Sequence, residues 1–89
     1  MNETLPRVPV RLPDLGIEQA DLTLSVWLVP LGARVAAGDR IVEILTGEAV
    51  VDLPAPHHGV LIEKLIPEDS SVETGQILGW IRQTESPLD

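Results

Sequence analysis

Cysteine, phenylalanine and tyrosine are all absent from this chain of 89 residues. Without cysteine there are no disulfide bonds and no thiolate metal ligands, and nothing points to an oxidising compartment. Without Phe and Tyr, and with only two Trp, the apolar core depends on Val, Leu and Ile. The β-branched residues among these favour strands. A chain of this length is expected to form one domain that buries about 60–65% of its unfolded surface.

Basic residues are also few, six against fourteen acidic ones, which gives a net charge of −8. This balance argues against nucleic acid or an anionic membrane surface as a partner. We expect the acidity mainly to keep a small domain soluble, with a basic protein partner as the alternative. No apolar run approaches the roughly 18–20 residues of a membrane span, and the first residues lack the pattern of a signal peptide. We therefore expect a monomeric, cytoplasmic domain.

The chain resembles itself at a fixed spacing. Leu24 and Leu61 are 37 positions apart, and the same spacing relates further apolar, Gly and Pro positions. These pairs are Leu28 and Leu65, Pro30 and Pro67, Val35 and Val72, Gly38 and Gly75, Ile41 and Leu78, and Ile44 and Ile81. A repeat with two copies predicts two similar half-domains packed on each other, since a solenoid needs three or more units.

Short runs rich in β-branched residues alternate with turn residues and prolines, which lack the amide proton that a central strand must donate. No capped helix of useful length is present. The pattern predicts an all-β fold, a flattened β-barrel or sandwich of two four-stranded antiparallel sheets with pseudo-twofold symmetry. The expected strands are Val8–Leu12, Leu22–Leu28, Arg34–Val35, Ile41–Thr46, Ala49–Leu53, Gly59–Leu65, Ser71–Val72 and Ile77–Ile81.

The second of these strands alternates with a period of two, which predicts that Trp27 points outward and seals the rim of the barrel. The residues on the opposite, core-facing side are Leu22, Leu24, Val26 and Leu28. By this interpretation the substitution Leu28→Ala costs roughly 2–5 kcal/mol of stability.

Residues 42–56 predict a β-hairpin. Two runs rich in β-branched residues flank Gly47 and Glu48, which form a two-residue turn. A Gly at the first central position of such a turn suits type II′, whose twist matches that of the strands. The hairpin therefore presents Gly47, Glu48 and Ala49 at an exposed tip.

Several segments, in collinear order, resemble the sequence motifs of lipoyl domains, the swinging-arm carriers of 2-oxo acid dehydrogenase complexes. The segments are Leu12–Gly16, Trp27–Val29, Val35–Asp39, the hairpin with Leu53–Pro56, Gly59–Val60 and Val72–Leu78. The resemblance covers Val8 to Arg82 and implies a lipoyl-like domain over residues 8–82, with flexible segments at 1–7 and 83–89. Biotinyl carriers share the fold, but their Ala-Met-Lys-Met turn has no counterpart here.

In lipoyl domains the hairpin tip reads Asp-Lys-Ala, and its lysine carries the lipoyl group. The resemblance places Gly47, Glu48 and Ala49 at these positions, so Glu48 replaces the carrier lysine. The one lysine of the chain, Lys64, falls within an expected strand. The resemblance therefore implies a domain without a lipoyl cofactor and without catalysis of its own.

Two functions remain open. The first is an unlipoylated structural or protein-interaction module, with partners of the lipoate ligase or 2-oxo acid dehydrogenase type and an acidic tip formed by Glu48 with Glu43 and Asp52 nearby. The alternative is a genuine lipoyl domain of a dihydrolipoamide acyltransferase in which Glu48 is a variant or engineered residue.

His57 and His58 are the only histidines. Adjacent residues on an extended chain point in opposite directions, which is poor geometry for binding one metal ion, and no cysteine is present to complete a zinc site. We expect an exposed loop and no metal here. No nucleophile elbow or phosphate-binding loop is present either, so the sequence predicts no catalytic residues.

Overall fold

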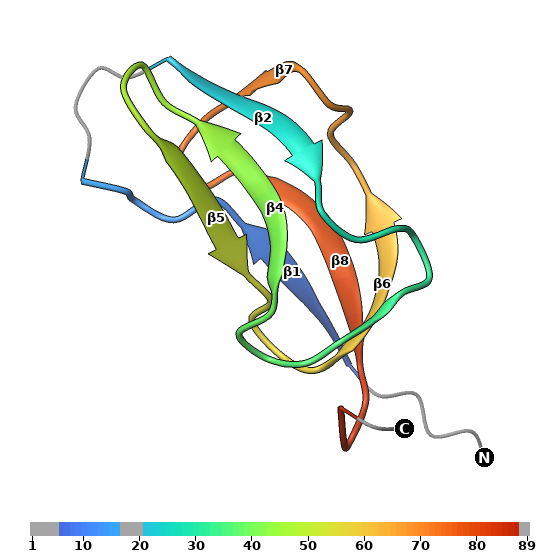
Figure 1. The fold of residues 1–89 in the computed structure, drawn as a ribbon. Helices are drawn as coiled ribbons and strands as arrows, with labels where there is room; N and C mark the ends of the chain where they lie inside the picture. Colours follow the sequence, from blue (N-terminus) through green and yellow to red (C-terminus); the bar gives the residue numbers. More distant parts are fainter. Residues whose placement is uncertain (1–5, 17–20, 88–89) are drawn as a thin grey trace.

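The computed structural model describes residues 6–16 and 21–87. Within these residues the chain forms two four-stranded antiparallel sheets (Figure 1), with the strand orders β1-β8-β6-β3 and β5-β4-β2-β7. The strands are β1 (Arg7–Arg11), β2 (Leu22–Trp27), β3 (Arg34–Val35), β4 (Arg40–Leu45), β5 (Val50–Pro54), β6 (Gly59–Lys64), β7 (Ser70–Val72) and β8 (Ile77–Gln83). The predicted all-β fold is confirmed. This part of the chain contains no helix long and apolar enough to cross a membrane.

The observed strand ends differ from the predicted ones by one or two residues. β1 begins at Arg7, which pairs with Arg82, and β8 continues to Gln83. The amide N–H of Gln83 donates to the carbonyl oxygen of Pro6 at 3.0 Å. The sheet therefore extends into both segments expected to be flexible, whose outermost residues, 1–5 and 88–89, lie outside the described part of the chain.

The repeat of 37 residues in the sequence is also present in the strand pairing: equivalent residues of the two sheets have equivalent partners. Leu24 of β2 pairs with Ile44 of β4, and Leu61 of β6 pairs with Ile81 of β8. In both strand pairs the register shifts by one residue directly after the leucine. The two half-domains predicted from the repeat are thus present and related residue by residue.

The edge strands β1 and β5 occupy equivalent positions in their sheets, beside β8 and β4. β1 is the first strand of the described residues, whereas β5 follows β4 through the hairpin turn. At that turn the N–H of Thr46 donates to the carbonyl oxygen of Ala49 at 2.8 Å, which matches the bond from Gln83 to Pro6 between the ends of β8 and β1. Figure 1 shows the β4–β5 turn at one end of the molecule and the start of β1 and end of β8 at the other. The tip therefore lies at the opposite end of the molecule from the start of β1 and the end of β8.

The core lies between the two sheets and is aliphatic, with no buried polar or charged residue in the described part of the chain. Its largest fully buried side chains are Leu12, Leu24, Ile41, Ile44, Leu61, Leu78, Ile81, Val10 and Val42. Each buried methylene contributes about 0.8 kcal/mol. Burial of this layer holds the two sheets together in a chain that has no disulfide.

Trp27 and Leu28 lie on the faces opposite to those predicted. Trp27 is 7% exposed, whereas Leu28 is 41% exposed. The pairing of β2 with β4 passes over Ser25, which forms a bulge between Leu24 and Val26. One extra residue in a strand reverses the alternation of the side chains that follow it. Leu28 is therefore not a core residue, and the predicted cost of Leu28→Ala is wrong.

Gly79 leaves room for the Trp27 ring. A Cβ atom at Gly79 would lie 3.0 Å from a ring carbon of Trp27 and would also collide with the carbonyl oxygen of Glu63. The equivalent position in the other half is Val42. The glycine thus marks the point where the repeat departs from symmetry to bury one large aromatic ring.

Candidate functional site

The hairpin tip is held by the side chain of Thr46. Its hydroxyl oxygen accepts hydrogen bonds from the amide N–H of Glu48 at 3.1 Å and of Ala49 at 2.8 Å, and the hydroxyl donates to the carbonyl oxygen of Ala49 at 3.1 Å. A Thr hydroxyl that bonds the backbone two or three residues ahead is a known way of forming a turn. This role was not predicted, although the Thr directly before the Gly was a usable signal.

Gly47 does not adopt the conformation that its position predicted. A type II′ turn requires a positive φ at the first central residue, and Gly47 is not among the residues with positive φ. The predicted turn type is therefore wrong. Instead, the Thr46 hydroxyl accepts the hydrogen bonds of the turn from the N–H groups of Glu48 and Ala49. A Cβ atom at Gly47 would have no atom within 4 Å. The tip thus has room for a side chain at this position.

Glu48 is exposed at the tip, and further carboxylates lie along the hairpin. Glu43 of β4 is directly opposite Asp52 of β5. The guanidinium of Arg40 lies 3.6 Å from Asp52, with 76% of the Arg40 side chain exposed. The hairpin therefore presents carboxylates at its tip and on its outer face, and no amine.

The one lysine of the chain lies elsewhere. Lys64 ends β6 in the other sheet, and its Nζ is 5.6 Å from the centroid of the Trp27 ring. Because Lys64 and Trp27 are equivalent positions of the repeat, their contact lies where the two half-domains meet. The structure does not bring Lys64 to the tip residues Glu48 and Ala49.

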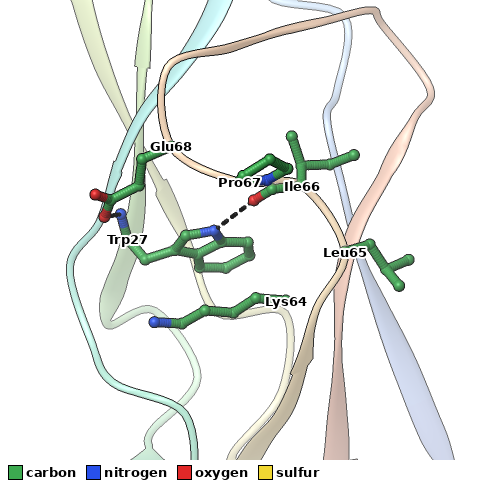
Figure 2. Close-up of a pocket in the computed structure, with 6 residues that line it drawn as sticks. All are labelled: Trp27, Lys64, Leu65, Ile66, Pro67 and Glu68. Carbon is green, nitrogen blue, oxygen red and sulfur yellow. Dashed lines mark hydrogen bonds between the residues drawn. The ribbon is translucent and has the colours of Figure 1, made fainter.

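An open surface pocket of about 290 Å³ surrounds this contact, lined by Trp27, Lys64 and residues 65–68. The indole N–H of Trp27 donates to the carbonyl oxygen of Ile66 at 3.0 Å, and its backbone N–H donates to Glu68 at 3.0 Å. Figure 2 shows the ring between the Lys64 side chain and the Ile66–Pro67 segment. Sequence reasoning missed this pocket because it placed Trp27 on the outside.

The two histidines differ from the expected geometry. The rings of His57 and His58 are in contact, with centroids 4.2 Å apart, and both residues are half-buried. Nδ1 of His57 lies 2.7 Å from the carbonyl oxygen of His58. The prediction that they point in opposite directions from an exposed loop is wrong, because this segment turns between β5 and β6. Residues 6–16 and 21–87 contain no cluster of three or more His, Cys, Asp or Glu that could hold a metal ion.

The chain matches one protein family over nearly its whole length. The family described as "Biotin-requiring enzyme" (Biotin_lipoyl) matches residues 8–81. Among similar proteins are the dihydrolipoyllysine-residue succinyltransferase components of the 2-oxoglutarate dehydrogenase complex from two bacteria. The protein from Buchnera aphidicola is 32% identical over 80 residues, which are 90% of this chain and 20% of that protein. The protein from Escherichia coli K12 is 35% identical over 79 residues, or 89% of this chain and 20% of that protein.

Solved structures give the same result for the fold. The lipoyl domain of the 2-oxoglutarate dehydrogenase complex from Azotobacter vinelandii superposes with a TM-score of 0.67 at 28% identity, covering 83% of this chain and 94% of that domain. A long-chain acyl-CoA carboxylase superposes with a TM-score of 0.71 at 23% identity, covering 97% of this chain and 8% of the carboxylase. The chain thus spans about one fifth of the curated relatives and nearly all of an isolated lipoyl domain.

Proposed function

Since this chain belongs to the biotin/lipoyl family, we propose that it is a lipoyl-type domain that carries no lipoyl group and acts through protein contacts instead. The observation that carries the proposal is the carboxylate of Glu48 at the exposed hairpin tip. The resemblance of the sequence motifs to lipoyl domains implies that this residue corresponds to their carrier lysine, and this supports the proposal.

The chemistry of attachment explains why Glu48 would prevent modification. A lipoyl group is joined to its carrier by an amide, in which a lysine amine displaces the leaving group of an activated lipoyl carboxyl. A carboxylate side chain has no nitrogen with which to form that amide. The one amine-bearing side chain, Lys64, lies beside Trp27 in the other sheet.

The rest of the tip supports a competent scaffold. The backbone of the turn is fixed by Thr46 through its bonds to the N–H groups of Glu48 and Ala49, so residue 48 is held at the end of a rigid hairpin. The open space around Gly47 would accept the Asp that carriers have there. In our proposal the domain therefore lost the reactive group and kept the surface that a carrier presents.

The relatives suggest where such a surface would be used. They are components of 2-oxoglutarate dehydrogenase complexes. We propose that this domain meets proteins of such a complex, or a lipoate ligase, as a non-catalytic module. Its net charge of −8 makes a basic surface on the partner the favourable match.

Lipoylation during co-expression with a lipoate ligase tests the proposal, with intact mass as the readout. The variants are the native chain and Gly47→Asp/Glu48→Lys, each also with Lys64→Arg so that an adduct on Lys64 is recognised. We expect no adduct on the native chain and one lipoyl group on the double substitution, with or without Lys64.

A lipoyl adduct on the native chain would overturn the proposal, and its loss with Lys64→Arg would assign the adduct to Lys64. Modification of the double variant but not of the native chain would show that the scaffold is competent and the native tip is disabled; modification of Glu48→Lys alone would show the alternative, a genuine carrier domain in which Glu48 is the variant residue. If neither protein is modified, the tip is not a ligase substrate for reasons beyond Glu48, and the proposed role of this residue is wrong.

A further inference from the structure

The two sheets differ at their outer edges. β1 and β5 are equivalent edge strands: Val8 pairs with Ile81 in one sheet as Val51 pairs with Ile44 in the other. One position further along, β1 has Pro9 and β5 has Asp52.

Among residues 6–16 and 21–87, no strand pairs with the outer side of β5 between Val50 and Asp52. The bond from Thr46 N–H to Ala49 O marks the first hydrogen-bonded pair of the hairpin, and such pairs alternate along antiparallel strands. The pairs formed by Val50 and by Asp52 are therefore the ones whose N–H and C=O groups point away from β4. In the described residues β4 is the only strand paired with β5.

The edge of β1 is closed by the same argument. The bond from Gln83 N–H to Pro6 O sets the alternation between β8 and β1, so the outward-pointing groups belong to Arg7 and Pro9. Proline has no N–H to donate, and proline on an edge strand blocks the addition of another strand. In the described part of the chain, one edge is therefore blocked by proline and the equivalent edge is unpaired.

The open edge also carries two carboxylates, Asp52 and Glu43, whose equivalents in the other sheet are uncharged. Asp52 and Glu43 are like charges directly opposite each other, which is an unfavourable cross-strand pair. Oδ1 of Asp52 is buried and has no hydrogen-bond partner among the described residues, while its Oδ2 is near Arg40. The equivalent pair in the other half is Pro9 with Trp80, so the same barrel accepts uncharged residues at these positions.

We propose that the open edge of β5 binds an extended, cationic segment of a partner protein by strand addition. The segment's backbone would pair with the N–H and C=O groups of Val50 and Asp52, as in other complexes formed by strand addition. A Lys or Arg opposite Asp52 would relieve the repulsion between Asp52 and Glu43. A second copy of this chain is disfavoured as the occupant, because its β5 edge would bring the same carboxylates.

The inference rests on the proposed function only in taking the domain as an interaction module. A charged edge also protects a sheet against aggregation, and protection by charge alone would not depend on the backbone N–H of Asp52. The two explanations therefore differ in what the N–H contributes.

The test is a titration of the full chain, labelled with ¹⁵N, with a capped heptapeptide in which lysine and valine alternate. A peptide with glutamate in place of lysine is the control. We expect saturable binding of the lysine peptide alone, with the amide signals of Val50 and Asp52 shifted most. Asp52→Asn should weaken binding about twofold to fivefold, the effect of one exposed ion pair.

Asp52→Pro should weaken binding about threefold to tenfold more than Asp52→Asn, because it also removes one hydrogen-bond donor. Pro9 shows that the barrel accepts proline at the equivalent position. If Asp52→Pro does not fold, N-methylation of the peptide answers the same question. Methyl groups on the lysine amides, which face Asp52, should abolish binding, and methyl groups on the valine amides should not.

The proposal is overturned if Asp52→Asn and Asp52→Pro bind the peptide with equal affinity, or if N-methylation of the peptide has no effect. It is also overturned if the largest shifts of amide signals lie outside β5. Each of these results would mean that the peptide binds by charge attraction alone. The absence of saturable binding to the native chain would overturn the proposal as well. The titration contains neither lipoate nor ligase, so its failure leaves the lipoylation result standing, and lipoylation of the native chain leaves the edge result standing.

Discussion

The indole N–H of Trp27 donates to the carbonyl oxygen of Ile66 at 3.0 Å and joins β2 of one sheet to the segment that follows β6 of the other. The ring is 7% exposed and lies over Gly79. A single aromatic side chain thus connects the two half-domains at the place where the repeat is least symmetric.

Trp27→Phe keeps an aromatic ring in this place but removes the indole N–H. We expect a loss of about 1–2 kcal/mol in the free energy of unfolding, because the carbonyl of Ile66 loses its partner and the smaller ring leaves space. Urea denaturation followed by circular dichroism measures the loss. Leu28→Ala, at the next position but exposed, is the control and should change stability by less than about 0.5 kcal/mol. A larger effect for Leu28→Ala would contradict the bulge at Ser25.

Gly47 and Gly38 are expected to respond in opposite directions to alanine. Gly47 has no positive φ and no atom near a Cβ, so Gly47→Ala should stabilise the chain by about 0.4–1 kcal/mol through the unfolded state. Gly38 has φ of +94°, so Gly38→Ala should destabilise it by about 1–2 kcal/mol. Thermal melting of both variants measures these changes in stability. Destabilisation by Gly47→Ala would contradict the observed turn and support a type II′ turn with a positive φ at Gly47.

Thr46→Val removes the hydroxyl that bonds the N–H groups of Glu48 and Ala49 while keeping the shape of the side chain. We expect a loss of about 0.5–1.5 kcal/mol and faster hydrogen exchange at Ala49. Thr74→Val is the matched control, since Thr74 is exposed and its hydroxyl has no hydrogen bond to the described residues. Unchanged exchange at Ala49 would show that the turn holds without the Thr46 side chain.

The sequence predicted the strands because proline, glycine and β-branched residues mark them locally, and it predicted the two halves because their apolar positions repeat. The bulge at Ser25 could not be predicted in this way. A bulge adds one residue to one strand, and the polar Ser25 fits a strictly alternating pattern equally well. The repeat did contain a signal for one turn that was not used. It aligns Asp69 with Gly32, and both residues have positive φ.

The position of the hairpin turn was predicted correctly, but the interaction that forms the turn was not. Gly47 at the tip suggested a turn formed by glycine, whereas the hydroxyl of Thr46 competes successfully for the same N–H groups. The open edge at Asp52 depends on which pairs in the hairpin are hydrogen-bonded. That alternation follows from three-dimensional pairing and is not visible in the order of residues.

The equivalence of the tip and the chain ends predicts that the barrel tolerates circular permutation. The bond from Gln83 N–H to Pro6 O has the same place in its sheet as the bond from Thr46 N–H to Ala49 O. A short flexible linker from Gln83 to Pro6 should therefore close a second hairpin, because the ends that it joins are already adjacent in the sheet. The chain can then be opened between residues 47 and 48.

We expect this permutant to fold with the amide spectrum of the native core and to unfold in one cooperative step. A matched permutant opened between Leu61 and Ile62, inside β6, should not fold, because it breaks a central strand of its sheet. With Gly47→Asp and Glu48→Lys added, the permutant opened at the tip should not be lipoylated, unlike the same double variant of the native chain. Its barrel remains intact, but the carrier residue is not held in a closed turn. If it were still modified, the ligase would read the sheets and not the hairpin tip.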